Sequence, residues 1–462
     1  MSRDALPDFV VTKAAMLGLP GAAVGIWAGG EESYSCYGVT SIDNPLPVDH
    51  HTLFVLGSVT KTYTATALMR LVAEGKVELD APVRRYVPDL VLSDEAASRS
   101  VTVLNLLNHT AGLDWRINVD TGEGDDALAR EIAKLPELPL VAMPGVRASY
   151  SQAGYALAGR IIETVTGLPY ETAIARLLFE PLGMAHSFFA RDDVMTRRFA
   201  VGHNLADDGR LRVASPWRHW RSDNPGGGLA SSVADQIRWA RFHLGDGRAQ
   251  GDTAVLPADL LHLMRRQTVA LRGSSLGDAF GICWFLRDID GVGTIGHDGS
   301  ANGQFANLLI VPDRDFAVAV MSNAGPDNGM AFNRAVIRWT LDHYLGLIDR
   351  DPEPLPYDRS QAERIAGHYE NEMMRLAIAN DGSGLTIECT IKADVRRAAD
   401  RELPPDIPPA GLGLLAGSGE DFMVTSGGLQ GQRGFFTRDQ SGTTTGIDLA
   451  GRFFKRTPND DS

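Results

Sequence analysis

Lysine is scarce in this 462-residue sequence. Only six of its 44 lysine and arginine residues are lysines, at positions 13, 61, 76, 134, 392 and 455. The formal net charge is -14 at pH 7, and the basic residues form no run. Proteins that bind nucleic acid or anionic lipid use clustered basic residues to neutralise phosphates. We therefore expect neither nucleic acid nor a membrane surface as a partner.

Cysteine is rarer still. Cys36, Cys283 and Cys389 lie far apart, and none of them belongs to a Cys-x-x-Cys motif or a Cys/His cluster. We interpret them as reduced thiols rather than a disulfide framework or a zinc site. The sequence thus predicts no metal and no other cofactor.

Long hydrophobic runs are also missing. No apolar run approaches the 18 residues or so that a membrane-spanning helix needs. The first 21 residues, "MSRDALPDFVVTKAAMLGLPG", include acidic residues where a secretion signal needs positive charge, and they lack an unbroken apolar segment. We expect a cytoplasmic, soluble protein, unless a leader preceded this sequence.

The residues that are present have the composition of a folded globular protein, with 44% hydrophobic and 22% charged residues. Apolar spacing predicts a helix over 7–18, and "AAVGIWAGGEESYSCYGV" predicts two strands joined at a Gly-Gly turn. Short β-rich runs return over 276–325, after a helical stretch of about 80–210. Strands before and after the helical stretch are therefore expected to form one sheet, with helices around it.

We therefore predict an α/β (α+β) domain over residues 1–348, with a helical lobe at roughly 80–210. The Pro- and acid-rich residues 349–356 are predicted to be a linker. Residues 357–462 contain short alternating runs such as "LTIEC" and "FMVTS", which favour a small antiparallel β barrel or sandwich. The role of this second domain, in covering the site or in assembly, stays open.

Ser58 and Lys61 in "FVLGSVTKTYTATALMR" have a spacing that suits nucleophilic catalysis. Residues three apart share one face of a helix, so the Lys61 amine can reach the Ser58 hydroxyl. Burial lowers the pKa of an ammonium group toward neutrality, which lets it accept a proton from a serine. The spacing alone is common, and both residues could also be ordinary members of a helical face.

Two further stretches contain candidate site residues. "RASYSQAGYALAG" places Tyr150 and Gln152 just before a predicted amphipathic helix, where the tyrosine could equally be a core aromatic residue. "TIGHDGSANGQFANLLIV" places His297 at the end of a predicted short strand and could equally hold a structural histidine. Gly299 follows, and its missing side chain would let a substrate backbone lie close.

In this order, Ser58-Val59-Thr60-Lys61, Tyr150-Ser151-Gln152 and His297-Asp298-Gly299 resemble the three motifs of the serine β-lactamase and penicillin-binding-protein superfamily. The resemblance covers about residues 5–345 and is greatest to class C β-lactamases, D-aminopeptidases and esterases of the S12 type. It implies that Ser58 is the acylated nucleophile and that Lys61 and Tyr150 transfer protons. It also implies an oxyanion hole from the backbone N–H groups of Ser58 and Ser300, with His297 positioning substrate or passing a proton.

Two departures from the family pattern bear on the substrate. His297-Asp298-Gly299 stands where β-lactamases and DD-peptidases have Lys-Thr-Gly, and no lysine occurs between Lys134 and Lys392. That family lysine commonly meets the substrate carboxylate, so we expect poor β-lactam turnover. Gln152 stands where asparagine is usual, and its extra methylene is expected to narrow the site or redirect a hydrogen bond.

The stretch "SPWRHWRSDNP" offers further candidates for the site. Trp217, His219 and Trp220 could line a pocket, and Arg218 or Arg221 could meet a carboxylate. Domain packing is the alternative interpretation.

The resemblance implies a serine hydrolase that cleaves a small ester, amide or peptide through a Ser58 acyl-enzyme. A weak class C-like β-lactamase and an acyltransferase are alternatives with the same intermediate. A ligand-binding protein without turnover is an alternative of another class. The expected partner is a small molecule or short peptide, and a homo-oligomer is an open possibility.

Overall fold

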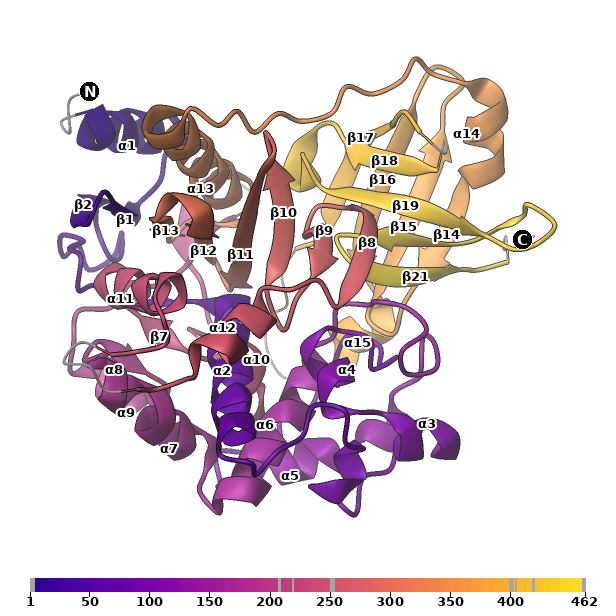
Figure 1. The fold of residues 1–462 in the computed structure, drawn as a ribbon. Helices are drawn as coiled ribbons and strands as arrows, with labels where there is room; N and C mark the ends of the chain where they lie inside the picture. The colour runs from indigo at the N-terminus through magenta and orange to yellow at the C-terminus, as the bar shows by residue number, and fades with distance from the viewer. Residues whose placement is uncertain are drawn as a thin grey trace.

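An antiparallel sheet of eight strands organises the larger part of the protein (Figure 1). The computed structural model describes residues 5–206, 209–217, 220–249, 254–398, 403, 405–417 and 420–458. In sheet order the strands are β2 (Glu31–Gly38), β1 (Gly21–Ala28), β13 (Phe316–Ser322), β12 (Gln304–Val311), β11 (Val292–Ala301), β10 (Phe285–Ile289), β9 (Gly277–Phe280) and β8 (Val269–Ser274). Strands from both ends of the predicted domain 1–348 are therefore neighbours in the sheet, since β1 pairs with β13 from Ala22↔Ser322 to Ala28↔Phe316.

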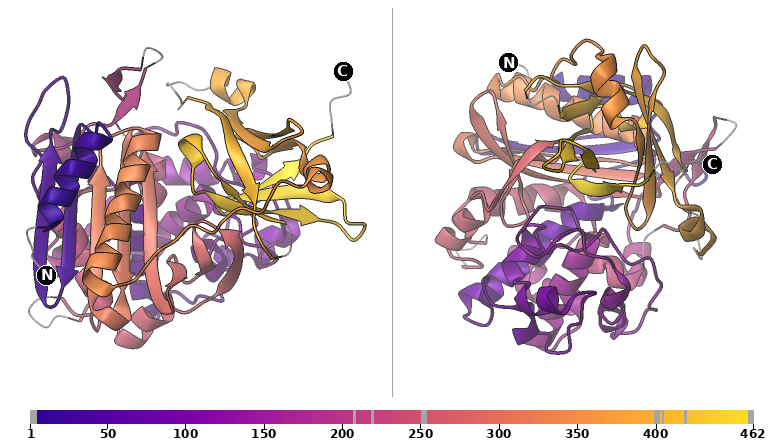
Figure 2. Two further views of the ribbon diagram at one scale, coloured as in Figure 1. Left: turned by 90° about the horizontal axis from the view of Figure 1, so that it is seen from above. Right: turned by 90° about the vertical axis from the view of Figure 1, so that its right-hand side faces the viewer.

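Helices cover both faces of this sheet. Helices α1 (Ala5–Met16) and α13 (Pro326–Thr340) lie on one face, and α11 (Val233–Leu244) lies on the other (Figures 1 and 2). Strand β13 is buried throughout, and its valines belong to one core cluster while its alanines belong to the other. A strand covered on both faces has no polar side, which explains its continuous apolar run.

The helical lobe lies below the sheet in Figure 1 and contains α2 (Thr60–Ala73) and α6 (Gln152–Thr166). The Ser151 side chain accepts a hydrogen bond from the Gly154 N–H, and Gly167 ends α6 in the left-handed conformation. Both are favourable helix-terminal residues for these reasons. They fix where α6 begins, and Tyr150 lies directly before its N-cap. No helix in the described residues is both long and apolar enough to cross a membrane.

The C-terminal part forms a closed antiparallel β barrel beside β8 and β9 (Figures 1 and 2). Its strands, in order, are β14 (Gly367–Glu370), β15 (Met374–Asn380), β16 (Leu385–Ile391), β17 (Ile407–Leu414), β18 (Asp421–Val424), β19 (Arg433–Arg438), β20 (Thr444–Leu449) and β21 (Arg452–Arg456). Buried side chains such as Tyr369, Phe422 and Phe436 fill its interior. The predicted fold class, including a small C-terminal β domain, is confirmed. Residues 346–358, which contain the proposed linker 349–356, form neither helix nor strand.

Candidate active site

Ser58 lies in a single 3-10 turn, Gly57–Val59, that leads directly into α2. Gly57 has a φ of +53°, and a Cβ there would lie 2.4 Å from the Ser300 carbonyl oxygen. Only glycine therefore permits this backbone conformation and this approach. The turn brings the Ser58 backbone against that of β11.

Gly299 makes the same contact from the other side. A Cβ on Gly299 would lie 1.9 Å from the Leu56 carbonyl oxygen and 2.9 Å from the Ser58 backbone nitrogen. The missing side chain of Gly299 was predicted to make room for a substrate backbone, but in the structure the Leu56–Ser58 backbone occupies that position. The contact aligns the Ser58 and Ser300 backbones, as an oxyanion hole requires.

Lys61 is fully buried one turn after Ser58. Its Nζ donates hydrogen bonds to Ser58 Oγ at 3.1 Å, to Gln152 Oε1 at 2.7 Å and to the Gly226 carbonyl oxygen at 2.6 Å. Burial lowers the pKa of Lys61 to about 7, and the positive charge of Arg452 acts in the same direction. The amine can therefore exchange protons with the serine near neutral pH.

Tyr150 completes this group, because its ring centroid lies 5.0 Å from Lys61 Nζ. The side chain is buried and packs against the His109 ring at 4.3 Å. Burial raises the pKa of Tyr150 far above its usual value, although a hydrogen bond with Ser58 and the charge of Arg452 oppose the shift. The phenol therefore stays protonated and can donate a proton.

Gln152 lies behind Lys61 rather than on the wall of the cavity. Its Oε1 accepts the hydrogen bond from Lys61, and its Nε2 lies 3.5 Å from the Asp223 carbonyl oxygen. A Cβ on Gly226 would lie 1.9 Å from Gln152 Nε2, so this glycine makes room for the amide. The Gln152 amide therefore contacts Lys61, whereas the sequence predicted that its extra methylene would narrow the site or redirect a hydrogen bond.

His297 lies within β11 rather than at the end of a short strand, because pairing with β12 continues to Ala301↔Gln304. Its Nδ1 lies 2.7 Å from the Asp298 carbonyl oxygen, and its ring stacks on Phe285 at 4.2 Å. Burial lowers the pKa of His297 to about 3, and the charge of Lys61 lowers it further. The imidazole is therefore neutral, with its proton on Nδ1 facing the carbonyl and Nε2 left as an acceptor. Nε2 is buried and has no hydrogen-bond partner among the described residues.

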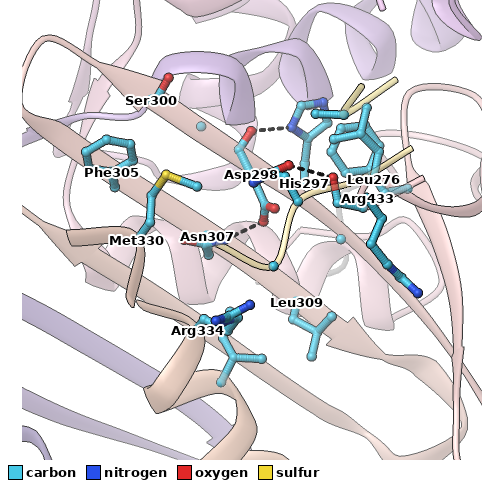
Figure 3. Close-up of a pocket in the computed structure, with 18 of the residues that line it drawn as sticks. Leu276, His297, Asp298, Ser300, Phe305, Asn307, Leu309, Met330, Arg334 and Arg433 are labelled. Atoms are coloured by element: carbon cyan, nitrogen blue, oxygen red, sulfur yellow. Dashed lines mark hydrogen bonds between the residues drawn. The ribbon is translucent and has the colours of Figure 1, made fainter. Parts of the chain in front are cut away.

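Ser58, Tyr150, His297 and Ser300 line a cavity of about 600 Å³. Residues of β11, α13 and the barrel line it too, and Figure 3 shows His297, Met330 and Arg433 from these three elements around it. The structure therefore brings together the predicted nucleophile, both predicted proton-transfer groups and the third motif. The arrangement can support acyl transfer from a carbonyl compound to a serine.

Comparisons with known proteins agree with this geometry. A family model described as "Beta-lactamase" matches residues 7–340, which is well over half of the chain. The chain belongs to the β-lactamase family. It is 35% identical to penicillin-binding protein 4 of Amycolatopsis lactamdurans over 363 residues, 77% of this chain and 94% of that protein.

Solved structures add two relatives to this family assignment. SurE is 26% identical with a TM-score of 0.74, and the match covers 98% of this chain and 99% of SurE. The D-amino acid amidase of Ochrobactrum anthropi SV3, complexed with D-phenylalanine, is 26% identical with a TM-score of 0.62, covering 72% of this chain and 96% of the amidase. The resemblance inferred from the three motifs is thereby confirmed.

Arg452 was not predicted as a site residue. In this member of the β-lactamase family, the barrel places it beside Tyr150. The Tyr150 backbone N–H donates to the Gly451 carbonyl oxygen at 2.7 Å. Arg452 follows Gly451, and its guanidinium lies 4.9 Å from the Tyr150 ring centroid and 5.0 Å from the Trp115 ring centroid. Arg452 Nε is buried without a hydrogen-bond partner in the described part of the chain. About 300 residues separate Arg452 from Tyr150 in the sequence, so only the docked barrel reveals it.

The aromatic stretch before the Gly-rich turn proves to be largely packing. Trp217 contacts Phe199 with ring centroids 5.7 Å apart, and its Nε1 donates to the Ala200 carbonyl oxygen. Arg221 donates to Glu171 and Asp125 rather than toward the cavity. Trp220 is buried, with the Arg116 guanidinium 5.8 Å from its ring. Arg218 and His219 lie outside the described residues.

Proposed function

We propose that this protein is a serine hydrolase that cleaves a small ester, amide or peptide through an acyl-enzyme on Ser58. The observation that carries the proposal is the buried Lys61, with a pKa of about 7 and its amine 3.1 Å from Ser58 Oγ. In this mechanism neutral Lys61 takes the proton as Ser58 Oγ attacks the carbonyl carbon. The Ser58 and Ser300 backbone N–H groups then stabilise the oxyanion.

Tyr150 relays the proton to the leaving group in this proposal. Its raised pKa keeps the phenol protonated at neutral pH, so Lys61 is the better base and Tyr150 the donor. Water then attacks the acyl-enzyme, with the same two groups working in reverse. An amine in place of water would give acyl transfer, so the acyltransferase alternative shares every step except the last.

Arg452 supports a substrate with a negatively charged or strongly polar end. Arg452 Nη1 donates to the Ala450 carbonyl oxygen at 3.5 Å, but its buried Nε has no partner among the described residues, which is costly unless an oxygen of the substrate meets it. The cation lies beside Tyr150, so that end of the substrate would lie close to Ser58. A short peptide with a free carboxylate meets this requirement, and the D-amino acid amidase relative separately favours amino acid amides over simple esters.

A substrate panel tests the proposal. It contains p-nitrophenyl esters, D- and L-aminoacyl p-nitroanilides and nitrocefin, with mass spectrometry of the quenched enzyme for each. We expect turnover of an aminoacyl or ester substrate and a covalent acyl group on Ser58. Reaction of nitrocefin alone would favour the β-lactamase alternative, and no labelling of Ser58 by a fluorophosphonate probe would favour a ligand-binding protein.

The rate is expected to depend on pH through Lys61. The amine acts as a base only when neutral, and its pKa is about 7. The value of kcat/KM should therefore rise from pH 5 to pH 8 with a midpoint near 7. His297 is neutral across this range and adds no second step, because its pKa is about 3. A flat profile between pH 5 and pH 8 would contradict the role given to Lys61.

Changing His297 to lysine should raise the rate of β-lactam acylation. A lysine at this position would supply the cation that Lys-Thr-Gly enzymes offer to the substrate carboxylate. Hydrogen bonds to charged groups contribute about 1.5–3 kcal/mol, so a rise of roughly 10- to 100-fold is expected for His297→Lys. Stopped-flow acylation by nitrocefin measures it, with the neutral His297→Gln as the control. Equal rates for the two variants would remove the stated reason for poor β-lactam turnover.

A further inference from the structure

Asp298 occupies a different part of the cavity from the catalytic group. Successive side chains of a strand point to opposite faces, so Asp298 faces α13 while His297 faces the other way. Figure 3 shows the His297 ring and the Asp298 carboxylate pointing away from each other. Asn307 lies opposite Asp298 on β12 and shares its face. The Asp298 side chain is exposed to the cavity.

The Asp298 carboxylate is held in place through one of its two oxygens. Asn307 Nδ2 donates to Asp298 Oδ1, and Asn333 Nδ2 donates to Asn307 Oδ1 at 2.8 Å, which orients the Asn307 amide. Within the described residues, Oδ2 has neither a hydrogen bond nor an ion pair. One carboxylate oxygen therefore stays available to a ligand in the cavity.

Most other carboxylates around the cavity are already neutralised. Asp349 pairs with Arg287 at 2.7 Å and with Arg338 at 3.1 Å, and Asp351 pairs with Arg338 at 2.6 Å. Asp327 lies in the first turn of α13, where the helix N-terminus offsets a negative charge. Asp298 thus supplies a negative charge on the sheet wall that makes no ion pair among the described residues, although the Arg287 guanidinium acts on it from a distance and Arg334 and Arg433 also line the cavity.

The distance from the oxyanion hole limits what Asp298 can reach. Asp298 and Ser300 are two positions apart on β11, and two positions along a strand span roughly 6.6 Å. An extended alkyl chain advances roughly 1.25 Å per bond, so about five or six bonds cover this span. Phe305 and Met330 lie beside this path in Figure 3 and offer apolar surface to methylene groups.

We propose that Asp298 binds a primary ammonium group of the substrate, carried on an alkyl stem about five or six bonds from the scissile carbonyl. An ornithine or lysine residue has this chemistry. The inference rests on the proposed function and names the substrate class of the same site.

Calorimetry on the Ser58→Ala protein tests this without requiring turnover. Lysinamide and norleucinamide, each as both enantiomers, share the α-ammonium and the alkyl stem and differ in the terminal ammonium. We expect one enantiomer of lysinamide to bind at least about 10-fold more tightly than its norleucinamide partner. Adding Asp298→Asn, which keeps the hydrogen bond from Asn307, should remove this preference. Adding Asp259→Asn, an equal charge change on the exposed start of α12 (Ala258–Met264), should leave it intact.

Equal affinity for the two amides, or a preference that survives Asp298→Asn, would overturn the inference. The proposed function fails by a different measurement, the absence of fluorophosphonate labelling at Ser58 in the wild-type protein. Labelling without a lysinamide preference would remove the ammonium site and leave the hydrolase proposal standing. A lysinamide preference without labelling would leave a cation-binding site in a protein that does not acylate.

Discussion

Replacing Ser58 with alanine is expected to abolish turnover, with kcat/KM falling by at least about 10⁴-fold. The change removes the one oxygen that would form the acyl-enzyme and leaves the 3-10 turn unchanged. Ser58 is only partly buried and lies at the mouth of the cavity, so the melting temperature should change little. Steady-state kinetics, fluorophosphonate labelling and thermal denaturation measure the three quantities on the same preparation.

Ser100→Ala provides the matched control for this variant. Ser100 ends α3 (Glu95–Ser100) on the surface, and its hydroxyl donates only to the Ala96 carbonyl oxygen. This variant should keep full activity and full labelling. Residual turnover or labelling of Ser58→Ala at the wild-type rate would show that another residue is the nucleophile.

Replacing Lys61 with methionine is expected to lower kcat/KM by about 10³-fold, within the range of general acid–base catalysis. Methionine fills most of the buried space but cannot take the proton from Ser58 Oγ. The Gln152 and Gly226 oxygens lose a donor, while the cost of burying a cation disappears. These effects oppose each other, so we expect a folded protein. Rates across pH 5 to 8 should lose the step near pH 7.

Lys76→Met separates catalysis from a general loss of positive charge. Lys76 follows α2 on the surface, where its amine pairs with Glu74 at 2.7 Å and is about half exposed. Exposed ion pairs contribute little, so this variant should match the wild-type protein in activity and pH profile. A Lys61→Met protein within tenfold of the wild-type rate would exclude Lys61 as the base.

Much of the proposed catalytic group could be predicted from the sequence because its arrangement depends on local geometry. The helical periodicity that places Ser58 and Lys61 on one face operates within a single turn, and the structure shows their atoms 3.1 Å apart. Tyr150 was predicted from a motif, and its position follows from the N-cap at Ser151 that starts α6. The β-rich runs at both ends of the first domain likewise predicted one sheet, because sheet strands need partners.

Other features of the site depend on which backbones come into contact. Gly299 was predicted to leave room for a substrate, but in the structure the Leu56 carbonyl oxygen lies where a side chain would be. Gln152 was predicted to narrow the site or redirect a hydrogen bond, and the structure shows its Oε1 accepting a hydrogen bond from Lys61. Neither contact could be inferred from spacing, because each joins segments whose relative position is set by packing.

Short motifs and hydrophobic periodicity were enough to predict the family and the fold class, and they also supplied the residues of the proposed acyl-transfer chemistry. Tertiary structure alone decided the depth at which Lys61 is buried, and burial is what brings its pKa to about 7. It alone placed Arg452 beside Tyr150 and left one oxygen of Asp298 open to the cavity. Desolvation and charge shift a pKa according to which groups are close in space, and folding brings together residues that are far apart in the sequence.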